Sequence, residues 1–407
     1  MRKRKLYNEV KRHVAEKEYT VITGARQTGK TTLLMQLQED LLSENKNVRY
    51  ISLEDPDILS GLNDHPENIF NYLTLNGKDK TYLLLDEIQY LDNPSNFLKF
   101  LFDKYASRLK IVATGSSAFY IDRKFKDSLA GRKRLFTLYT LDFDEFLEFK
   151  TESTSLTEEL IEIRKNEKYQ SLKRRELSIL FSEYLTFGGY PAVVLSNTPE
   201  KKKLLLKDLV HSYLQKDILE SRVRDEKNFY SLLILLASQA GNILNMNELS
   251  NTLGISVTAV ENYIYILQKS FHVHLIRPFH TNIRKELTKM PKVYFNDIGF
   301  RNTILNSYQS IETRLDKGAL IENYAFIRLR QKVGQEYLKF WRTTGGNEID
   351  FIINVPGKSK KEAIEIKFDS TSFNKKKYKK FLEIYPEFTL NVRALTAKNN
   401  ATDILAL

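Results

Sequence analysis

Hydrophobic and polar positions follow two alternating rhythms along the first third of the chain. Short apolar runs typical of buried strands lie at 18–23, 48–53, 80–86, 109–115 and 133–139. Between them, apolar residues recur every three or four positions, which predicts amphipathic helices at 30–43, 67–75 and 95–107. This alternation of strands and helices favours an α/β fold in which a parallel sheet carries helices on both faces.

The middle of the chain has helical spacing almost throughout. From 143 to 228 it predicts a helical connector, interrupted by a turn at Gly188-Gly189-Tyr190-Pro191. From 229 to 310 it predicts helices at 229–240, 246–253 and 256–270, and then a strand at 272–278. Helix, turn at Gly254, helix and strand in this order is typical of a winged helix-turn-helix, with Ser256 as the N-cap of the recognition helix. The alternative is a small helical module that contacts other proteins.

The last segment, 311–407, reads as an independent α/β unit. It predicts a helix at 315–332, a Lys-rich helix at 373–382 and strands near 336–343, 347–354, 361–367 and 388–395. The chain is therefore expected to divide into four parts: 1–142, 143–228, 229–310 and 311–407.

Composition agrees with a packed protein of several domains, because 42% of the 407 residues are hydrophobic and 12% are aromatic. Lys and Arg outnumber Asp and Glu by 63 to 51, and the net charge of +12 favours polyanionic partners such as nucleic acid. The basic tracts at 2–5, 201–203 and 375–380 are candidate phosphate contacts, although a solvated face is the better explanation for any one of them.

The location of the protein follows from what the sequence lacks. It contains no cysteine, which is compatible with a reducing compartment and excludes thiol catalysis and thiolate metal sites. It has no uncharged apolar run long enough to span a membrane, and the basic residues at 2–5 are not followed by the apolar core of a secretory signal. We expect a cytoplasmic protein.

The segment between the first strand and the first long helix carries the pattern G-x-x-x-x-G-K-[ST]. Such a loop turns its backbone N–H groups toward a phosphate, while the lysine reaches the β- and γ-phosphate oxygens and the hydroxyl binds Mg²⁺. The lysine here is Lys30 and the hydroxyl residue is Thr31. The alternative is an ordinary glycine-containing turn before a helix. The expected ATP-binding residues are Gly24, Ala25, Arg26, Gln27, Thr28, Gly29, Lys30, Thr31 and Thr32.

A second acidic element follows the strand at 80–86, where three leucines lead into Asp86 and Glu87. Beside a phosphate-binding loop, Asp86 would orient the water shell of Mg²⁺ and Glu87 would act as the general base for the attacking water. The alternative is a helix cap. With both elements present, the sequence predicts ATP hydrolysis with ATP and Mg²⁺ as its cofactors.

Two further candidates complete this site. The strand at 109–115 ends in hydroxyl residues, and Ser116 or Thr114 would contact the γ-phosphate or position water, unless it caps the strand end. Arg132 would stabilise transition-state charge, within the chain or from a neighbouring subunit, unless it is a surface arginine.

These motifs together resemble the archaeal-type AAA+ ATPases that occur in archaea and bacteria. The resemblance rests on the segments 24–32, 83–87, 113–117, 129–132 and 141–146, and on the turn at 187–191. It implies a P-loop NTPase fold of the AAA+/RecA-like kind with Lys30, Thr31, Asp86 and Glu87 in the roles above. It also implies a polar sensor near Ser116 and a possible homo-oligomer.

The last segment holds a second polar set, in which Glu322 lies on a helix and Asp350, Glu365 and Lys367 lie on strands. Alternation puts Glu365 and Lys367 on one face of their strand. Acid, acid and E-x-K suit a Mg²⁺-dependent nuclease, and their order resembles the restriction-endonuclease-like core that follows the ATPase module in many such proteins. In that family a proline often precedes the aspartate, but no proline precedes Asp350 here. An active nuclease, a related fold without activity and ordinary strand charges all remain open.

The sequence therefore favours an Mg²⁺-dependent ATPase that acts as a switch or motor, with DNA as the expected partner of the helix-turn-helix and nuclease-like parts. The competing hypothesis is an ATP-controlled signalling or scaffold protein whose C-terminal half binds proteins. No membrane partner is expected.

Overall fold

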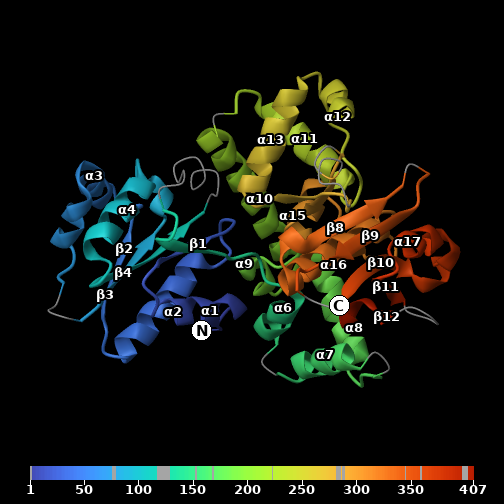
Figure 1. Ribbon diagram of the computed structural model, residues 1–407, viewed down its shortest axis with the longest axis horizontal. Helices are drawn as coiled ribbons and strands as arrows, with labels where there is room; N and C mark the ends of the chain where they lie inside the picture. The colour runs from blue at the N-terminus through green and yellow to red at the C-terminus, as the bar shows by residue number, and fades with distance from the viewer. Residues whose placement is uncertain are drawn as a thin grey trace. The chain divides into compact units, whose positions relative to one another are not determined.

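The computed structural model describes residues 2–75, 79–116, 129–151, 154–166, 169–221, 223–280, 286, 289–343, 345–357, 360–396 and 402–407. The chain forms two compact units, which Figure 1 shows in colours running from blue to red. Unit 1 comprises Met1–Thr140 with Lys269–Phe271, and unit 2 comprises Leu141–Gln268 with His272–Leu407. None of the described helices is both long and apolar enough to cross a membrane.

Unit 1 is built on a five-stranded sheet in which every strand pair is parallel. The strand order across the sheet is β2-β3-β4-β1-β5. The strands are β1 (Tyr19–Thr23), β2 (Asn47–Ser52), β3 (Thr81–Asp86), β4 (Leu109–Gly115) and β5 (Lys133–Thr137). Since β4 lies between β1 and β3, the carboxyl ends of these three strands meet along one edge of the sheet.

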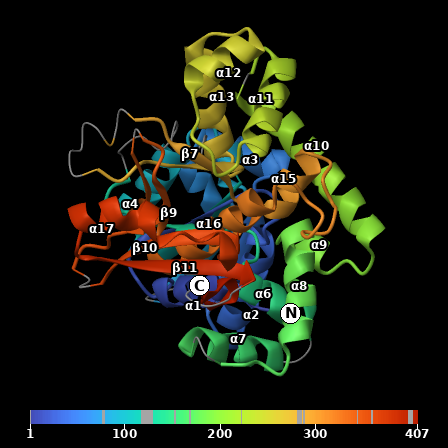
Figure 2. The same ribbon diagram turned by 90° about the vertical axis from the view of Figure 1, so that its right-hand side faces the viewer.

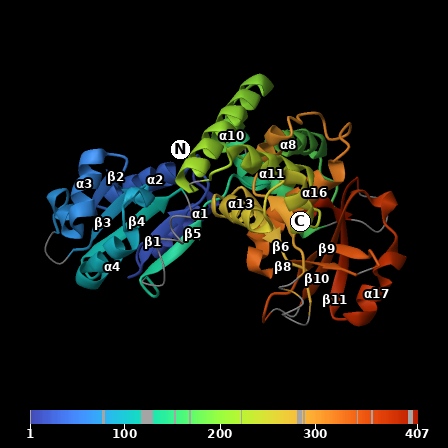
Figure 3. The same cartoon turned by 90° about the horizontal axis from the view of Figure 1, so that it is seen from above.

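Helices cover both faces of this sheet, as the alternation predicts. Alternate side chains of each strand enter two separate cores: Leu83 and Leu85 face one core, and Leu84 faces the other. The first core is closed by α3 (Pro56–Asp64) and α4 (Pro94–Tyr105), and the second by α1 (Lys5–His13) and α2 (Lys30–Ser43). Figure 3 shows the layers from above. The predicted α/β class is confirmed.

One predicted helix of unit 1 is wrong. Instead of a helix at 67–75, the chain forms α3 and then a short 3₁₀ helix over Pro66–Asn71. Asp55 starts α3 by accepting hydrogen bonds from the backbone N–H groups of Asp57 and Ile58, with Pro56 in the first turn. Pro66 then prevents the helix from continuing. Capping residues determine where the helices of this segment begin and end more strongly than apolar spacing does.

Unit 2 begins with five helices, as the predicted connector requires. They are α6 (Phe143–Lys150), α7 (Ser155–Lys165), α8 (Arg174–Phe187), α9 (Pro191–Val194) and α10 (Pro199–Ser221). α8 leads into the Gly188-Gly189 turn, which packs against the start of α15 (Ile298–Ile304). There Asp297 accepts a hydrogen bond of 2.8 Å from the Gly189 N–H group. The turn is therefore a close contact between two backbones.

Gly299 lies on the other side of this contact, where a Cβ atom would come within 2.0 Å of the Phe187 carbonyl oxygen. We expect Gly299→Ala to lower the free energy of unfolding by about 3 kcal/mol or more, because backbone must move to admit the methyl group. Gly318, in α16 (Lys317–Val333), is the matched control. Nothing lies within 4 Å of its added Cβ, so Gly318→Ala is expected to raise stability by up to about 1 kcal/mol. Urea unfolding of both variants measures the difference, and equal effects would contradict this account of the turn.

The next segment has the elements expected of a winged helix-turn-helix, in the expected order. Helices α11 (Glu226–Ser238), α12 (Met246–Leu253) and α13 (Val257–Lys269) precede an antiparallel pair, β6 (Val273–Ile276) and β7 (Lys292–Phe295). Gly254 ends α12 in a left-handed conformation with φ of 66°, and Ser256 accepts a hydrogen bond from the Ala259 N–H group, as an N-cap does.

The rest of unit 2 is a mixed sheet with the order β12-β11-β10-β9-β8. Its strands are β8 (Leu338–Arg342), β9 (Glu348–Ile353), β10 (Lys361–Asp369), β11 (Phe388–Thr396) and β12 (Thr402–Asp403). Helix α16 (Lys317–Val333) packs on one face, and α17 (Lys379–Ile384) on the other, as Figure 2 also shows. The Lys-rich segment is shorter as an α-helix than predicted, because its first part, Lys375–Tyr378, is a 3₁₀ turn. The finer division into four domains stays a prediction.

Candidate nucleotide site

The phosphate-binding loop joins β1 to α2 at the carboxyl edge of the sheet in unit 1. Its backbone takes left-handed φ values at Gly24 (153°), Gln27 (54°) and Gly29 (96°). A Cβ atom at Gly24 would lie 2.1 Å from the Leu138 carbonyl oxygen, so only glycine fits there. The loop thus has the curled backbone that turns N–H groups toward a phosphate.

Lys30 is the first residue of α2, and only 4% of its surface is exposed. Its ammonium group donates hydrogen bonds to the carbonyl oxygens of Gly24 (3.0 Å) and Ala25 (2.8 Å). Burial lowers the pKa of Lys30 to about 8, and the nearby carboxylate of Glu87 offsets part of that effect. The lysine is therefore held at the loop as a poorly hydrated cation that a phosphate would stabilise.

This pKa predicts how nucleotide binding depends on pH. A bound phosphate favours the charged amine, so the pKa of Lys30 is higher in the complex than in the free protein, and binding above pH 8 takes up a proton. We expect the Kd of a non-hydrolysable ATP analogue to be insensitive to Lys30 titration below about pH 7.5. It should then rise by up to about tenfold per pH unit above pH 8. Titrations of a fluorescent analogue test this, and Lys30→Met should abolish the slope.

Thr31 and Asp86 meet across the site. The Thr31 hydroxyl donates a 2.7 Å hydrogen bond to Asp86 Oδ2, and the same oxygen accepts a 3.0 Å bond from the Tyr50 hydroxyl. Asp86 is the last residue of β3 and is 4% exposed. Hydroxyl and carboxylate oxygens at this spacing suit a hard cation such as Mg²⁺, so the predicted pair fits that ion. No group of three or more His, Cys, Asp or Glu side chains in the described ranges is placed to hold a metal ion without a ligand's help.

Glu87 follows Asp86 in a left-handed conformation, with φ of 58°. Its backbone N–H group donates a 3.1 Å bond to the Thr114 hydroxyl, which in turn donates to Asp86 Oδ1. Residues other than glycine rarely adopt this conformation, and they do so mostly where surrounding contacts enforce it. Thr114 therefore holds the two acidic residues in fixed relative positions.

The next residue of this network, Gln89, was missed by the sequence reasoning. Gln89 is 6% exposed. Its side-chain amide donates one hydrogen bond to Glu87 Oε2 and another, of 2.9 Å, to Ser116 Oγ. It also accepts a 3.2 Å bond from the Ser116 N–H group. The predicted sensor Ser116 is thus connected to the predicted base through one amide. A glutamine two residues after a candidate base is a weak signal in sequence alone.

Arg132 lies away from these groups. Its guanidinium forms an ion pair with Asp103 at 2.7 Å. Its carbonyl oxygen accepts a hydrogen bond from the N–H group of Tyr19, at the start of β1, whereas the loop follows the end of that strand. The structure therefore places Arg132 at the opposite edge of the sheet from the nucleotide loop of its own chain. A role on a neighbouring subunit stays a prediction.

Arg4 contacts the backbone of the phosphate-binding loop, and no sequence motif predicted this contact. Arg4 is 7% exposed, and its guanidinium donates hydrogen bonds to the carbonyl oxygens of Thr28 (2.7 Å) and Tyr139 (2.8 Å). We expect Arg4→Ala to raise the Kd of an ATP analogue roughly fivefold and to lower the free energy of unfolding by about 1–3 kcal/mol, because it frees two buried carbonyl groups. Arg12→Ala is the control, because the Arg12 side chain donates a hydrogen bond to the Asn8 carbonyl oxygen in its own helix and none to the loop among the described residues. Titration with the analogue and urea unfolding measure the two effects. Equal effects of Arg4→Ala and Arg12→Ala would show that Arg4 does not stabilise the loop.

In unit 2, the four predicted nuclease residues lie near one another but in two groups. Ile364 and Ile366 face the core, and Glu365 Oε1 pairs with Lys367 on the other face of β10, as the alternation predicts. Glu322 and Asp350 instead share the ammonium of Lys292, at 3.0 and 3.5 Å. Burial and the Asp350 carboxylate raise the pKa of both Glu322 and Glu365. Burial lowers the pKa of Lys292, but the surrounding carboxylates outweigh it and raise the pKa above its usual value.

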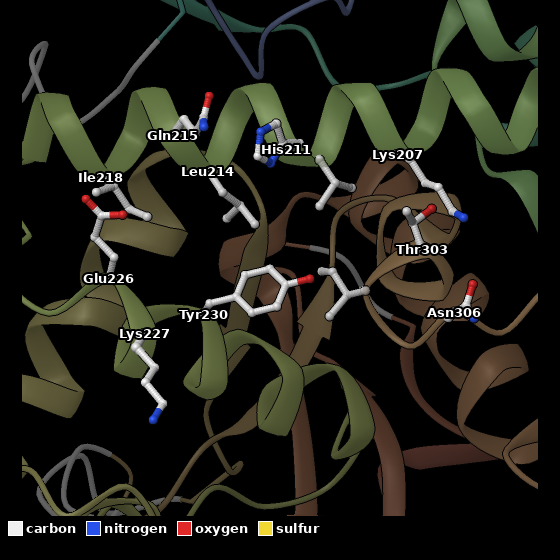
Figure 4. Close-up of a pocket in the computed structure, with 12 residues that line it drawn as sticks. Lys207, His211, Leu214, Gln215, Ile218, Glu226, Lys227, Tyr230, Thr303 and Asn306 are labelled. Carbon is white, nitrogen blue, oxygen red and sulfur yellow. The ribbon is translucent and has the colours of Figure 1, made fainter.

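Unit 2 also contains a pocket of about 700 Å³ that the sequence did not reveal. Figure 4 shows it between α10, which contributes Leu214 and Ile218, and α11, which contributes the ring of Tyr230. Polar and charged side chains, among them Lys207 and Glu226, complete a mixed lining. Its walls come from segments far apart in the chain, which explains why periodicity alone does not predict it.

The five-stranded parallel sheet, the glycine loop and the facing Asp86 define unit 1 as a P-loop NTPase, which is a nucleotide-binding fold. Residues 16–147 match the family described as "AAA domain". Residues 178–310 and 317–403 match two families described as domains of unknown function, DUF8612 and DUF4143. The predicted AAA resemblance is therefore confirmed, while these matches leave the winged-helix and nuclease-like assignments as predictions.

Related proteins occur in both archaea and bacteria. The chain is 27% identical over 388 residues to an uncharacterized protein of Methanocaldococcus jannaschii, covering 92% of this chain and 81% of the relative. It is also 27% identical over 347 residues to an uncharacterized protein of Haemophilus influenzae, covering 82% and 78%.

Two solved structures with 16% identity are also similar to parts of the chain. One is the replication initiator DnaA bound to AMPPCP and single-stranded DNA, with a TM-score of 0.29 over 65% of this chain and 86% of that one. The other is the Thermotoga maritima RuvB Holliday junction branch migration motor, with a TM-score of 0.31 over 70% and 93%.

Proposed function

We propose that this protein is an Mg²⁺-dependent ATPase that works as a switch or motor on DNA. The observation that carries the ATPase part is the 2.7 Å hydrogen bond between Thr31 and Asp86. It brings the loop that would bind phosphate next to the strand end that would orient a metal ion. Glu87 follows directly, so one short segment supplies both a metal-orienting carboxylate and a base.

Each residue then has a defined task in hydrolysis. The loop N–H groups and Lys30 bind the phosphates, and Thr31 and Asp86 hold Mg²⁺ and its water shell. When bound, the ion would supply positive charge that offsets the negative charge of the phosphates. Glu87 accepts a proton from the attacking water, and Ser116, at the end of β4, lies within the same hydrogen-bonded network to orient that water or the γ-phosphate.

Support for DNA as the partner comes from charge and from the order of elements in unit 2. The chain carries a net charge of +12, and five exposed lysines cluster at 375–380. The exposed side chains of α13 include Glu261 and Asn262 but no arginine, and only the partly exposed Lys269 at its end is basic. Phosphate contacts are therefore expected mainly outside this helix.

The test is ATP turnover measured with and without DNA, at fixed Mg²⁺ and at several salt concentrations. A DNA-linked switch should show a turnover rate that changes several-fold on DNA addition, and its DNA affinity should fall steeply as salt rises. Turnover that does not respond to DNA at any salt concentration would refute the DNA part of the proposal. Absence of turnover under all conditions would refute the ATPase part.

The scarcity of basic side chains on the exposed face of α13 favours a second candidate, in which unit 2 binds a protein partner and ATP controls assembly. In that case DNA affinity should be weak even at low salt. The salt titration above separates the two candidates, because only the first predicts tight binding at low salt.

A further inference from the structure

The carboxylate cluster of unit 2 contains a cation supplied by the chain itself. Lys292, the first residue of β7, is 1% exposed. Its ammonium nitrogen lies 3.0 Å from Glu322 Oε1, 2.5 Å from Glu348 Oε1 and 3.5 Å from Asp350 Oδ1. A lysine ammonium has three N–H donors, and here three carboxylates surround it. The carboxylates come from α16 and β9, so this cluster joins three elements that are distant in the chain.

The position of Lys292 does not fit a nuclease that holds a divalent ion between Glu322 and Asp350. The ion would need the same oxygens at about 2.0–2.6 Å, and it would be repelled by an ammonium group that is already there. Asp350 Oδ2 is also engaged, since it accepts a 2.9 Å hydrogen bond from the Ile366 N–H group. With Lys292 in place, no group of three or more His, Cys, Asp or Glu side chains in the described residues is arranged to hold a metal ion.

Lys292 is also unable to leave by a simple side-chain rotation into water. It is almost fully buried, and its strand pairs with β6 through Ile276. Tyr294, two residues along on the same side of β7, donates a 2.6 Å hydrogen bond to Glu322 Oε1. The strand therefore inserts two side chains into the cluster together, and both must move before the carboxylates are free.

We propose that Lys292 is the resident cation of this cluster, in the place that a divalent metal ion would take. The cluster is then an ionic lock that fastens the β6–β7 hairpin to α16 and β9, and unit 2 is not a nuclease that depends on a divalent ion bound by Glu322 and Asp350. Removal of the ammonium, with its carboxylates left in place, is expected to turn the lock into a site for a divalent cation.

The test uses the full chain and Mn²⁺ as the probe, without nucleotide. Free Mn²⁺ is measured by electron paramagnetic resonance, so that weak binding at the nucleotide site appears as a background shared by all variants. Lys292→Gln should gain one additional Mn²⁺ per chain with an affinity at least tenfold above that background, and Asp350→Asn added to it should remove the gain. Mn²⁺ should also raise the melting temperature of Lys292→Gln but not that of the parent protein.

Lys339→Gln is the matched control, because it breaks another partly buried ion pair of unit 2, with Glu286, and leaves the cluster intact. It should gain no Mn²⁺ site. If Lys292→Gln folds but gains no site, the proposal is overturned. If Lys292→Gln does not fold, Asp350→Asn in the parent decides: unchanged Mn²⁺ binding supports the proposal, and loss of a bound Mn²⁺ overturns it.

Discussion

Lys30→Ala is expected to reduce ATP turnover at least about a hundredfold and to weaken ATP binding. The Lys30 ammonium group is buried at the phosphate loop, and it lies among backbone carbonyls that cannot replace its charge. Loss of a single preorganised group of this kind costs roughly 2.7–4 kcal/mol of transition-state stabilisation, which corresponds to a factor of about 10²–10³. Steady-state turnover and titration with a fluorescent ATP analogue measure the two effects.

The control for this variant is Lys46→Ala, which removes an exposed lysine after α2 in the same unit. It should leave both turnover and affinity within about twofold of the parent. The circular dichroism spectrum of Lys30→Ala should match that of the parent, since the residue makes no contribution to either core of the sheet. Normal ATP turnover by Lys30→Ala would show that the loop is not the nucleotide site.

Glu87→Gln is expected to separate binding from chemistry. The amide keeps the size of the side chain and an oxygen that accepts a hydrogen bond from Gln89, but it cannot take a proton from water. We therefore expect turnover to fall by about 10²–10⁴, while the Kd for ATP changes by no more than about threefold. Single-turnover hydrolysis, together with analogue binding, measures these quantities.

Glu54→Gln is the matched control, because Glu54 is an exposed carboxylate in the loop after β2, at the same edge of the sheet. It should retain turnover within about twofold. A Glu87→Gln protein that hydrolyses ATP within tenfold of the parent rate would remove Glu87 as the base. Lys30→Ala and Glu87→Gln together distinguish loss of the phosphate-binding site from loss of the general base.

The sequence predicts the central part of unit 1 well because its signals are local. The glycine spacing at Gly24 and Gly29 encodes the loop directly, since left-handed backbone conformations favour glycine. The apolar runs at 80–86 and 109–115 become β3 and β4 with nearly the predicted bounds. By contrast, the segment around 56–71 was predicted wrongly, because capping by Asp55 and a break at Pro66 outweigh its apolar spacing.

The contacts that connect site residues could not be predicted, because each joins positions far apart in the chain. Thr114 reaches Asp86 and Glu87 only because β4 lies beside β3 in the sheet. Arg4 reaches the loop only because α1 packs near it, and Arg132 is kept away from it because β5 begins beside the start of β1. Strand order decides the positions of Thr114 and Arg132, and helix packing decides that of Arg4. Apolar periodicity carries no information about either.

By itself, the sequence determined the parallel α/β class, the phosphate loop and the acidic pair, because glycine conformation, side-chain alternation and a contiguous motif are properties of neighbouring residues. The tertiary structure alone decided which hydroxyls and amides join the acidic pair, on which edge of the sheet Arg132 lies, and that Lys292 occupies the cluster of Glu322 and Asp350. Such relations arise when packing of the two cores and pairing of distant strands bring side chains together, and they are fixed by the fold as a whole.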